Sequence, residues 1–175
     1  MREIIMIIFI FIIAAFVCSC ADKTADDWIS QEQQLWDGQK YTDPQKAIEY
    51  LNNAIRLQPN NAETYNKRGT AYYNLGQYEN TIKDDSEAIR LAPQYPEAYN
   101  NRAGAYVRLG EFQKAIEDYN QAIRLKPNHP VFYNNRAVVH LKHGKKDVGC
   151  SDAKKACELG DCVTLEEANA RKYCR

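Results

Sequence analysis

Three arginines and three aspartates recur at a fixed interval of 34 residues: Arg68, Arg102 and Arg136, and Asp84, Asp118 and Asp152. Guanidinium groups beside carboxylates can form the charged set of an active site, where they stabilise developing charge. An active site, however, is not normally built three times in one chain. We therefore expect structural pairs, because a planar guanidinium forms paired hydrogen bonds with a carboxylate. Each pair would tie together the two helices of one repeat, or adjacent repeats.

The histidines and other reactive residues give no catalytic arrangement. His129 lies in an expected loop, whereas His140 and His143 stand where tyrosine and leucine stand one and two intervals earlier, which favours packing roles. The sequence contains no nucleophile–base pair, phosphate-binding glycine loop or recognisable carboxylate pair. It therefore predicts no enzyme activity, no cofactor and no small-molecule substrate.

Four cysteines lie in the last 26 residues: Cys150, Cys157, Cys162 and Cys174. An even number of clustered cysteines in an exported chain favours disulfides. If the last two helices run antiparallel around a turn near residues 160–162, Cys150 lies opposite Cys174, and Cys157 meets Cys162 across the turn. Buried free thiols are one alternative. Zinc is another, but no CxxC pair supports it, and we expect no metal.

The 34-residue interval is not limited to charged residues. It is also kept by Tyr65, Tyr99 and Tyr133; by Asn66, Asn100 and Asn134; by Gly76, Gly110 and Gly144; and by Ala88, Ala122 and Ala156. Within a block, apolar residues lie three, four and seven apart, which predicts two helices separated by the glycine. One such helix pair cannot bury its apolar faces alone, so we expect neighbouring blocks to stack.

This pattern of aromatic residues, small residues and a terminal proline resembles the tetratricopeptide repeat (TPR) family over about residues 26–160. The resemblance implies an all-α fold, a right-handed α-solenoid of about four helix-turn-helix repeats with a C-terminal capping helix. The expected division is a signal peptide (1–19), a tether (20–25), four repeats (26–61, 62–95, 96–129 and 130–161) and a cysteine-containing cap (162–175).

Both ends of the array depart from the repeat. An opening helix is expected over Trp28 to Trp36, followed by a turn longer than in the other blocks. Asp43 and Pro44 then predict an N-cap and a first helical residue. At the other end, Thr164 and Glu167 form a capping-box pattern that opens a final helix over 163–174.

The chain begins with an apolar run from Ile4 to Cys18, which is short for a membrane-spanning helix and fits a secretory signal. Ser19 followed by Cys20 resembles the signal of bacterial lipoproteins, in which the cysteine is lipidated. Cys20 is therefore the expected lipidation site, and an uncleaved anchor is the alternative. In both cases we expect the repeats in the bacterial cell envelope, outside the cytoplasm and tied to a membrane.

Polar residues that recur but are not needed for packing indicate where a partner binds. In the family that the chain resembles, the first helix of each repeat lines a concave groove for an extended peptide or helix. An asparagine side chain there can donate to and accept from a peptide backbone. The candidate groove residues are Asn66, Lys67, Thr70, Tyr73, Asn74, Asn100, Asn101, Arg108, Asn134, Asn135 and Lys142. A merely solvated polar face is the alternative.

Charge bounds the kind of partner. The 23 basic and 23 acidic residues cancel, and no basic stripe is present, so we expect no nucleic acid. Lys67, Arg108 and Lys142 would favour an acidic segment or a C-terminal carboxylate. The expected function is a non-catalytic scaffold that binds another envelope protein. The alternative is an accessory subunit, structural or chaperone-like, docked permanently in a larger envelope assembly.

Overall fold

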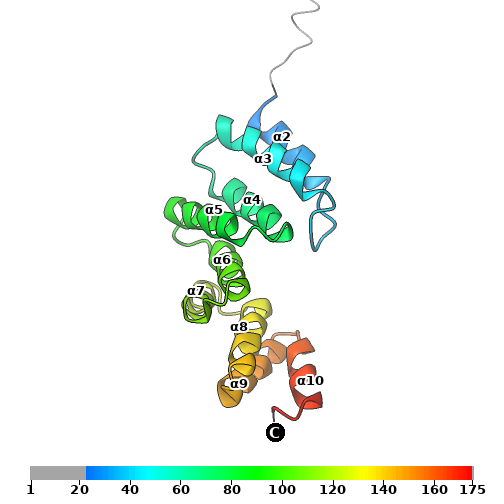
Figure 1. Cartoon of the computed structure of the whole chain (residues 1–175), viewed down its shortest axis with the longest axis vertical. Coiled ribbons are helices and arrows are strands. Elements are labelled where there is room, and N and C mark those ends of the chain that lie inside the picture. Colours follow the sequence, from blue (N-terminus) through cyan, green and yellow to red (C-terminus); the bar gives the residue numbers. More distant parts are fainter. Residues whose placement is uncertain (1–22, 175) are drawn as a thin grey trace, which may run out of the picture.

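The computed structural model describes residues 23–174, which form helices joined by short turns, with no β-strand among them (Figure 1). The helices are α2 (Ala25–Gln33), α3 (Pro44–Leu57), α4 (Ala62–Asn74), α5 (Tyr78–Leu91), α6 (Pro96–Arg108), α7 (Phe112–Leu125), α8 (Pro130–Lys142), α9 (Lys146–Glu158) and α10 (Val163–Ala170). None of these helices is long and apolar enough to cross a membrane. The leader, with Ser19 and Cys20, lies outside the described residues.

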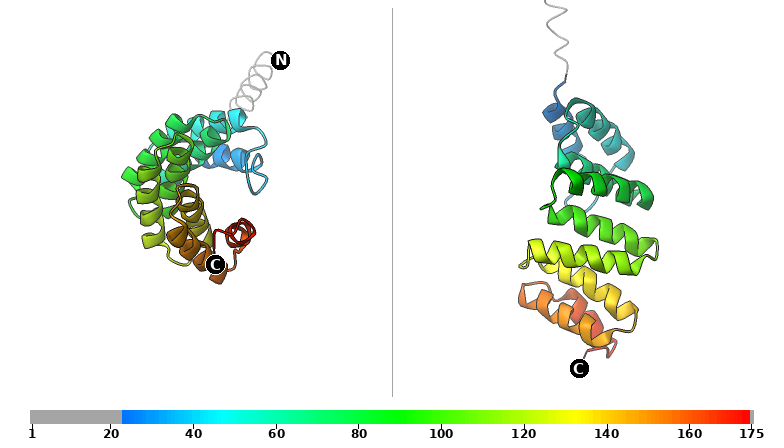
Figure 2. Two further views of the ribbon diagram at one scale, coloured as in Figure 1. Left: turned by 60° about the horizontal axis from the view of Figure 1, so that its bottom comes forward. Right: turned by 90° about the vertical axis from the view of Figure 1, so that its left-hand side faces the viewer.

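The helices stack in consecutive pairs, α2 with α3, α4 with α5, α6 with α7 and α8 with α9, and the stack curves into an arc (Figure 2). The all-α solenoid expected from the 34-residue interval is thus confirmed. Small residues allow the close packing, because Ala103, Ala115 and Ala122 are fully buried between helices. Tyr119 and Val139 fill the space beside them.

Local sequence explains where most helices begin and end. Pro44, Pro96 and Pro130 each occupy the first turn of a helix, where a missing N–H costs nothing. Asp43 caps α3 as expected, since its side chain accepts a hydrogen bond from the backbone N–H of Lys46. The turn inside each repeat closes on a glycine with positive φ, namely Gly76 (73°), Gly110 (79°) and Gly144 (74°).

Each recurring arginine joins two repeats. Arg102 donates from Nε and Nη2 to the carboxylate of Asp118, at 2.7 and 2.8 Å, within its own repeat. Its Nη1 donates to Ser86 Oγ, at 3.0 Å, on the second helix of the preceding repeat. The same arrangement occurs in the neighbouring repeats, as Arg68 with Asp84 and Asn52, and Arg136 with Asp152 and Asn120. The third polar partner, also 34 residues apart, was not anticipated from the sequence.

The opening helix is shorter than the sequence indicated. α2 ends at Gln33, and Trp36 lies in the following turn, where it forms an isolated β-bridge with Tyr41. The backbone N–H of Thr42 donates to the carbonyl of Leu35 at 2.9 Å, so the chain folds back on itself before α3 begins. Leu35 and Trp36 were therefore wrongly assigned to the helix, because this turn has its own hydrogen bonds.

The final helix also stops early, at Ala170 rather than at residue 174. Lys172 takes a left-handed conformation with φ 56°, and the N–H of Tyr173 returns to the carbonyl of Ala168 at 2.8 Å. Hydrogen bonds of this kind close a helix C-terminus. The last residues of the described chain therefore form a tail that turns back toward α9.

The capping box expected at the start of α10 is wrong. The N-cap residue is Cys162, and no side chain forms a capping hydrogen bond there. Thr164 is instead buried on the inner side of the helix, and Glu167 is exposed. Burial of the helix face takes precedence over the local capping pattern.

Candidate partner-binding groove

The inner surface of the arc is lined by the first helices of the repeats, and its central pocket lies between α4, α6 and α8 (Figure 2). The pocket has a volume of about 230 Å³ and is lined by Thr70, Tyr73, Asn100, Asn101, Gly104, Tyr119 and Asn135. Gly104 keeps it open, because a Cβ at this position would lie 3.6 Å from the Tyr73 ring. Most of these residues were expected in the groove from the sequence.

Two asparagines form hydrogen bonds between neighbouring first helices. Asn101 Nδ2 donates to Thr70 Oγ1, and Asn135 Nδ2 donates to Asn100 Oδ1, each at 2.9 Å. Within residues 23–174, the side-chain oxygens of Asn101 and Asn135 accept no hydrogen bond. Each amide is therefore oriented by its neighbour and keeps an acceptor for a bound chain.

Asn66 and Asn134 do not take part in this arrangement. Both are buried, and Asn66 donates to Asp85 Oδ1 at 2.8 Å while it accepts from the Tyr95 hydroxyl at 3.1 Å. The neighbouring position in the repeat faces the groove instead, since successive helical residues are 100° apart. Of the two asparagine registers expected in the groove, the one that contains Asn101 and Asn135 supplies its exposed amides.

An aromatic pocket lies at the N-terminal end of the same surface. It has a volume of about 390 Å³ and is lined by Glu32, Gln33, Trp36, Tyr41, Lys67 and Thr70. The Trp36 ring is 40% exposed and packs edge-on against the buried Tyr41 ring, with centroids 5.0 Å apart. Because Thr70 lines both the aromatic pocket and the central pocket, the two are adjacent.

Polar contacts hold the aromatic pocket in place. The backbone N–H of Tyr41 donates to Asn74 Oδ1 at 3.0 Å, and its hydroxyl donates to the buried Glu32 carboxylate. Burial, together with this carboxylate, raises the pKa of Tyr41. Sequence reasoning missed the contribution of Glu32, Trp36 and Tyr41 to the groove, and the unusual length of the turn was the only signal for it.

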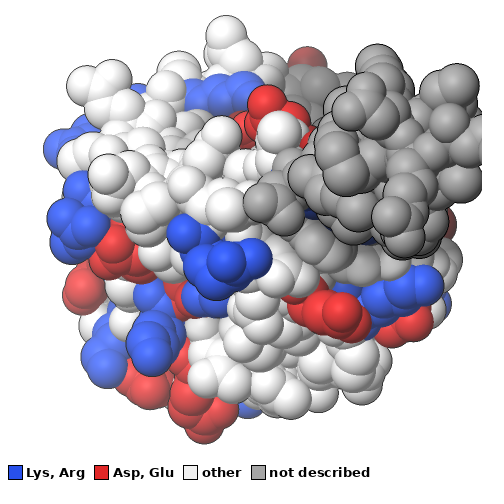
Figure 3. Space-filling model, turned by 90° about the horizontal axis from the view of Figure 1, so that it is seen from above, with Lys and Arg blue, Asp and Glu red and all other residues white. Residues whose placement is uncertain are grey.

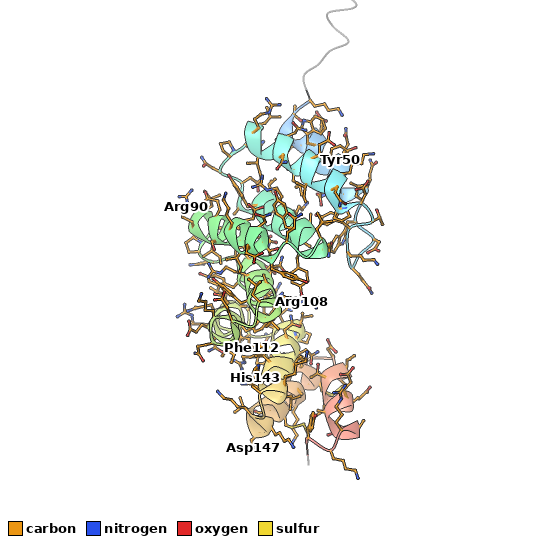
Figure 4. The ribbon with its side chains drawn as sticks, in the orientation of Figure 1. Tyr50, Arg90, Arg108, Phe112, His143 and Asp147 are labelled. Carbon is orange, nitrogen blue, oxygen red and sulfur yellow. A yellow bond between two sulfur atoms is a disulfide. The ribbon has the colours of Figure 1, made fainter. Side chains whose placement is uncertain are left out.

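The three basic candidates have different surroundings. Lys67 lies 3.3 Å from Glu32 and 3.5 Å from Glu63, so acidic residues already balance its charge. Arg108 Nε donates to the Tyr78 hydroxyl at 3.0 Å (Figure 4). Lys142 forms no ion pair within residues 23–174, and it lies at the other end of the groove.

A C-terminal pocket surrounds Lys142, between α8 and α10. Its volume is about 290 Å³, and its lining consists of Val138, Leu141, Lys142, Thr164, Glu167, Ala168, Arg171 and Tyr173. Val138 follows Gly104 by 34 residues, so this pocket continues the inner row of the repeats. The sequence did not indicate Arg171, because α10 has no counterpart in the repeat.

Two cysteine pairs lie at bonding distance beside this pocket. Cys150 and Cys174 have Cα atoms 5.5 Å apart, and Cys157 and Cys162 have Cα atoms 4.0 Å apart, with a sulfur–sulfur bond in each pair. The first pair joins the C-terminal tail to α9. These are the pairings that the antiparallel arrangement of the last two helices favoured.

The histidines have packing roles. His143 lies against Phe112, with ring centroids 3.9 Å apart (Figure 4), and His140 is buried. Burial lowers the pKa of His140, which keeps its imidazole neutral. Within residues 23–174, no group of histidine, cysteine, aspartate or glutamate side chains could hold a metal ion. On the face shown in Figure 3, acidic and basic residues are intermixed and form no large patch of one sign.

Comparison with known proteins places this geometry in a family. A family model described as TPR repeat matches residues 44–76, 69–110 and 103–144. None of the curated proteins compared with the chain matches it.

Solved structures show the same fold. The crystal structure of MamA is 26% identical over 90% of this chain and 86% of that one, with a TM-score of 0.71. TTC0263, a TPR protein of Thermus thermophilus, is 19% identical over 79% of this chain and 75% of that one, with a TM-score of 0.70. The first TPR of Spaghetti (RPAP3), bound to the HSP90 peptide SRMEEVD, is 26% identical over 65% of this chain and 90% of that one, with a TM-score of 0.60. The chain therefore belongs to the TPR repeat family, whose members are protein–protein interaction scaffolds.

Proposed function

We propose that this protein is a non-catalytic scaffold of the bacterial cell envelope, which binds an extended segment of another envelope protein along the inner surface of the arc. The observation that carries the proposal is the row formed by Thr70, Asn101 and Asn135. Its amides are oriented by neighbouring helices and keep free acceptors between an aromatic pocket and a C-terminal pocket.

An extended peptide is the chemistry that such a row fits. Backbone N–H groups of a bound chain can donate to the side-chain oxygens of Asn101 and Asn135, which gives affinity with little dependence on sequence. Trp36 would add specificity, because an exposed indole buries a large apolar area when a side chain packs against it. The peptide bound to the TPR of Spaghetti supports this mode of binding by analogy.

The second candidate, a permanently docked subunit, would need a continuous apolar surface outside the groove. The large exposed apolar side chains of the described residues are instead spread over separate segments, and one of them, Trp36, belongs to the groove. The others are Leu57, Leu109, Val131, Val148 and Val163. We therefore prefer transient peptide binding. The envelope location rests on the leader and on the four C-terminal cysteines.

The test is selection from a phage-displayed library of random dodecapeptides on the immobilised full chain with its disulfides intact. Selected peptides should bind the wild type and lose at least about tenfold in affinity for the Asn101→Ala/Asn135→Ala variant, with a smaller loss for Trp36→Ala. A variant with Asn80→Ala and Asn128→Ala serves as the matched control, since both asparagines are exposed and lie outside the three pockets. Circular dichroism should show equal helix content in all variants.

Two outcomes would contradict the proposal. One is a failure to select any peptide whose binding depends on the inner surface. The other is selected peptides that bind the Asn101→Ala/Asn135→Ala variant and the control variant equally well.

A further inference from the structure

We propose that the C-terminal pocket binds the free carboxylate at the C-terminus of the partner segment, with an apolar side chain on that last residue. The inference rests on the proposed function, because it assigns a direction and an end to the peptide in the same groove. It places the recognition of charge at α8 and α10 rather than along the whole inner surface.

The charges of the pocket favour an anion. Lys142 comes from α8 and Arg171 from the end of α10, both are exposed, and neither forms an ion pair within residues 23–174. Glu167 is the one acidic residue in the lining, and it also lies beyond ion-pair distance of the described cations. The pocket thus keeps one net positive charge, whereas Lys67 at the other end of the groove is balanced by two glutamates.

The floor of the pocket favours an apolar side chain beside that anion. Val138 and Leu141 are half-buried on α8, and Ala168 is buried on α10. Leu141, Leu165 and Tyr173 pack against the cluster that Ala168 forms with the bonded cysteines. A volume of about 290 Å³ leaves room for one side chain and its carboxylate.

The position of α10 favours a chain terminus over an internal acidic residue. The groove runs through residues spaced by 34, from Thr70 through Gly104 to Val138. At that point α10 lies on the inner side of the arc, next to α8 (Figure 2). A peptide that extends along the row from the aromatic pocket therefore meets α10 and has to end there.

The pocket depends on the pair Cys150–Cys174. Arg171 lies three residues before Cys174, and the bond fixes this tail against α9. α10 itself is only eight residues long, so it adds little stability of its own. Reduction should therefore remove the arginine and one wall of the pocket together.

The probe for this site is a pair of peptides, acetyl-tetraalanyl-leucine with a free carboxylate and the same peptide amidated. Each is titrated into the ¹⁵N-labelled full chain in its oxidised form, and amide resonances are followed by NMR. The free acid should shift resonances of α8 and α10 and bind at least about tenfold more tightly than the amide, as expected for charge-assisted hydrogen bonds. Chemical reduction should bring its affinity down to that of the amide.

The matched variants separate local from general charge effects. Lys142→Gln/Arg171→Gln should lower the affinity for the free acid about tenfold and leave the amide unaffected. Lys83→Gln/Arg124→Gln removes the same charge from exposed positions on α5 and α7 and should change neither. Circular dichroism checks that both variants keep their helix content.

Several results would overturn the proposal. These are equal binding of acid and amide, no loss in the Lys142→Gln/Arg171→Gln variant, or equal binding of an amidated peptide with an internal aspartate. If library peptides still require Asn101 and Asn135 while amidation has no effect, the proposed function stands and the carboxylate site is rejected. If library peptides do not require the asparagines, the groove function itself fails.

Discussion

At the scale of single residues, the arginines that join the repeats are the most regular feature of the molecule. Each guanidinium lies near a tyrosine ring of its own helix, as Arg102 does over Tyr99 at 5.8 Å, in addition to its three hydrogen bonds. The side chain of Arg102 is 19% exposed and that of Asp118 is 9% exposed. The pair is therefore screened less than a surface ion pair and matters for stability.

Replacing Asp118 with alanine should lower the free energy of unfolding by roughly 1–3 kcal/mol, because it leaves the Arg102 guanidinium semi-buried without its main partner. Arg102→Leu should cost less, since the apolar stem is retained. Urea unfolding of both single variants and the double variant gives the coupling energy. Additive effects in this cycle would show that the two residues stabilise the fold independently.

Asp85 predicts a dependence of stability on pH. Its carboxyl is fully buried, its Oδ2 accepts no hydrogen bond among the described residues, and burial raises its pKa well above the usual range, with the Asn66 amide acting in the opposite direction. Since the pKa is higher in the folded state, the favourable contribution is complete below the unfolded pKa, about 4, and is lost as the pH rises through the folded pKa.

Asp85→Asn should remove this dependence. The variant should gain stability relative to the wild type as the pH rises above about 4, by about 1.4 kcal/mol for each unit of the pKa difference. Urea unfolding at a series of pH values measures the effect. Asp147→Asn, at an exposed carboxylate on α9, is the control. Parallel stability curves for wild type and Asp85→Asn would mean that Asp85 is already ionised in the folded protein.

At the scale of elements, the repeated helices could be predicted from the sequence and the irregular ones could not. Every block that keeps the 34-residue interval has helices, glycine turns and prolines where local rules place them. The turn after α2 departs because Tyr41 is fixed by Asn74, which is 33 residues further along the chain. A contact between distant positions of this kind leaves no periodic signal.

The same limit applies to the groove. The asparagine register was visible in the sequence, but the choice between Asn66 and its neighbour at position 67 depended on the buried Asp85, which stands where Tyr119 stands in the next repeat. Arg171 could not be placed because the cap belongs to no repeat. Packing between helices decided these cases, and local pattern did not.

The cap gives the prediction at this scale. Val163 is 63% exposed, so α10 is held mainly by Leu165, Ala168 and the bond between Cys150 and Cys174. A loop closed over a sequence separation of 24 is worth roughly 3 kcal/mol in the chain-entropy model. Reduction should therefore lower the thermal midpoint and speed amide hydrogen exchange in residues 162–175 first, while α4 to α7 stay protected.

Peptide mapping without reduction provides the control for this experiment. It should recover Cys150 linked to Cys174 and Cys157 linked to Cys162. Four free thiols, or bound zinc, would contradict the pairing. Unchanged exchange in the cap after reduction would show that packing alone holds α10.

At the scale of the whole molecule, the array is a small arc with a polar inner surface and intermixed surface charge (Figures 2 and 3). Its described helices cannot cross a membrane, so an attachment to one has to come from outside residues 23–174. A single covalent lipid gives only marginal membrane binding, whereas two or more acyl chains give stable anchoring. An envelope scaffold of this size therefore needs a modified N-terminus to stay at its membrane.

Cys20 is the residue we expect to carry that lipid, after cleavage behind Ser19. The apolar run from Ile4 to Cys18 and the small residue before Cys20 motivate this prediction. Mass spectrometry of the mature N-terminus from native membranes should find a peptide that begins at Cys20 with acyl groups attached. Cys20→Ala should release the protein from the membrane or leave its leader uncleaved, whereas Cys18→Ala should do neither. A mature protein that still contains Arg2 and Glu3 would establish the uncleaved anchor instead, with the same arc of repeats attached by a different means.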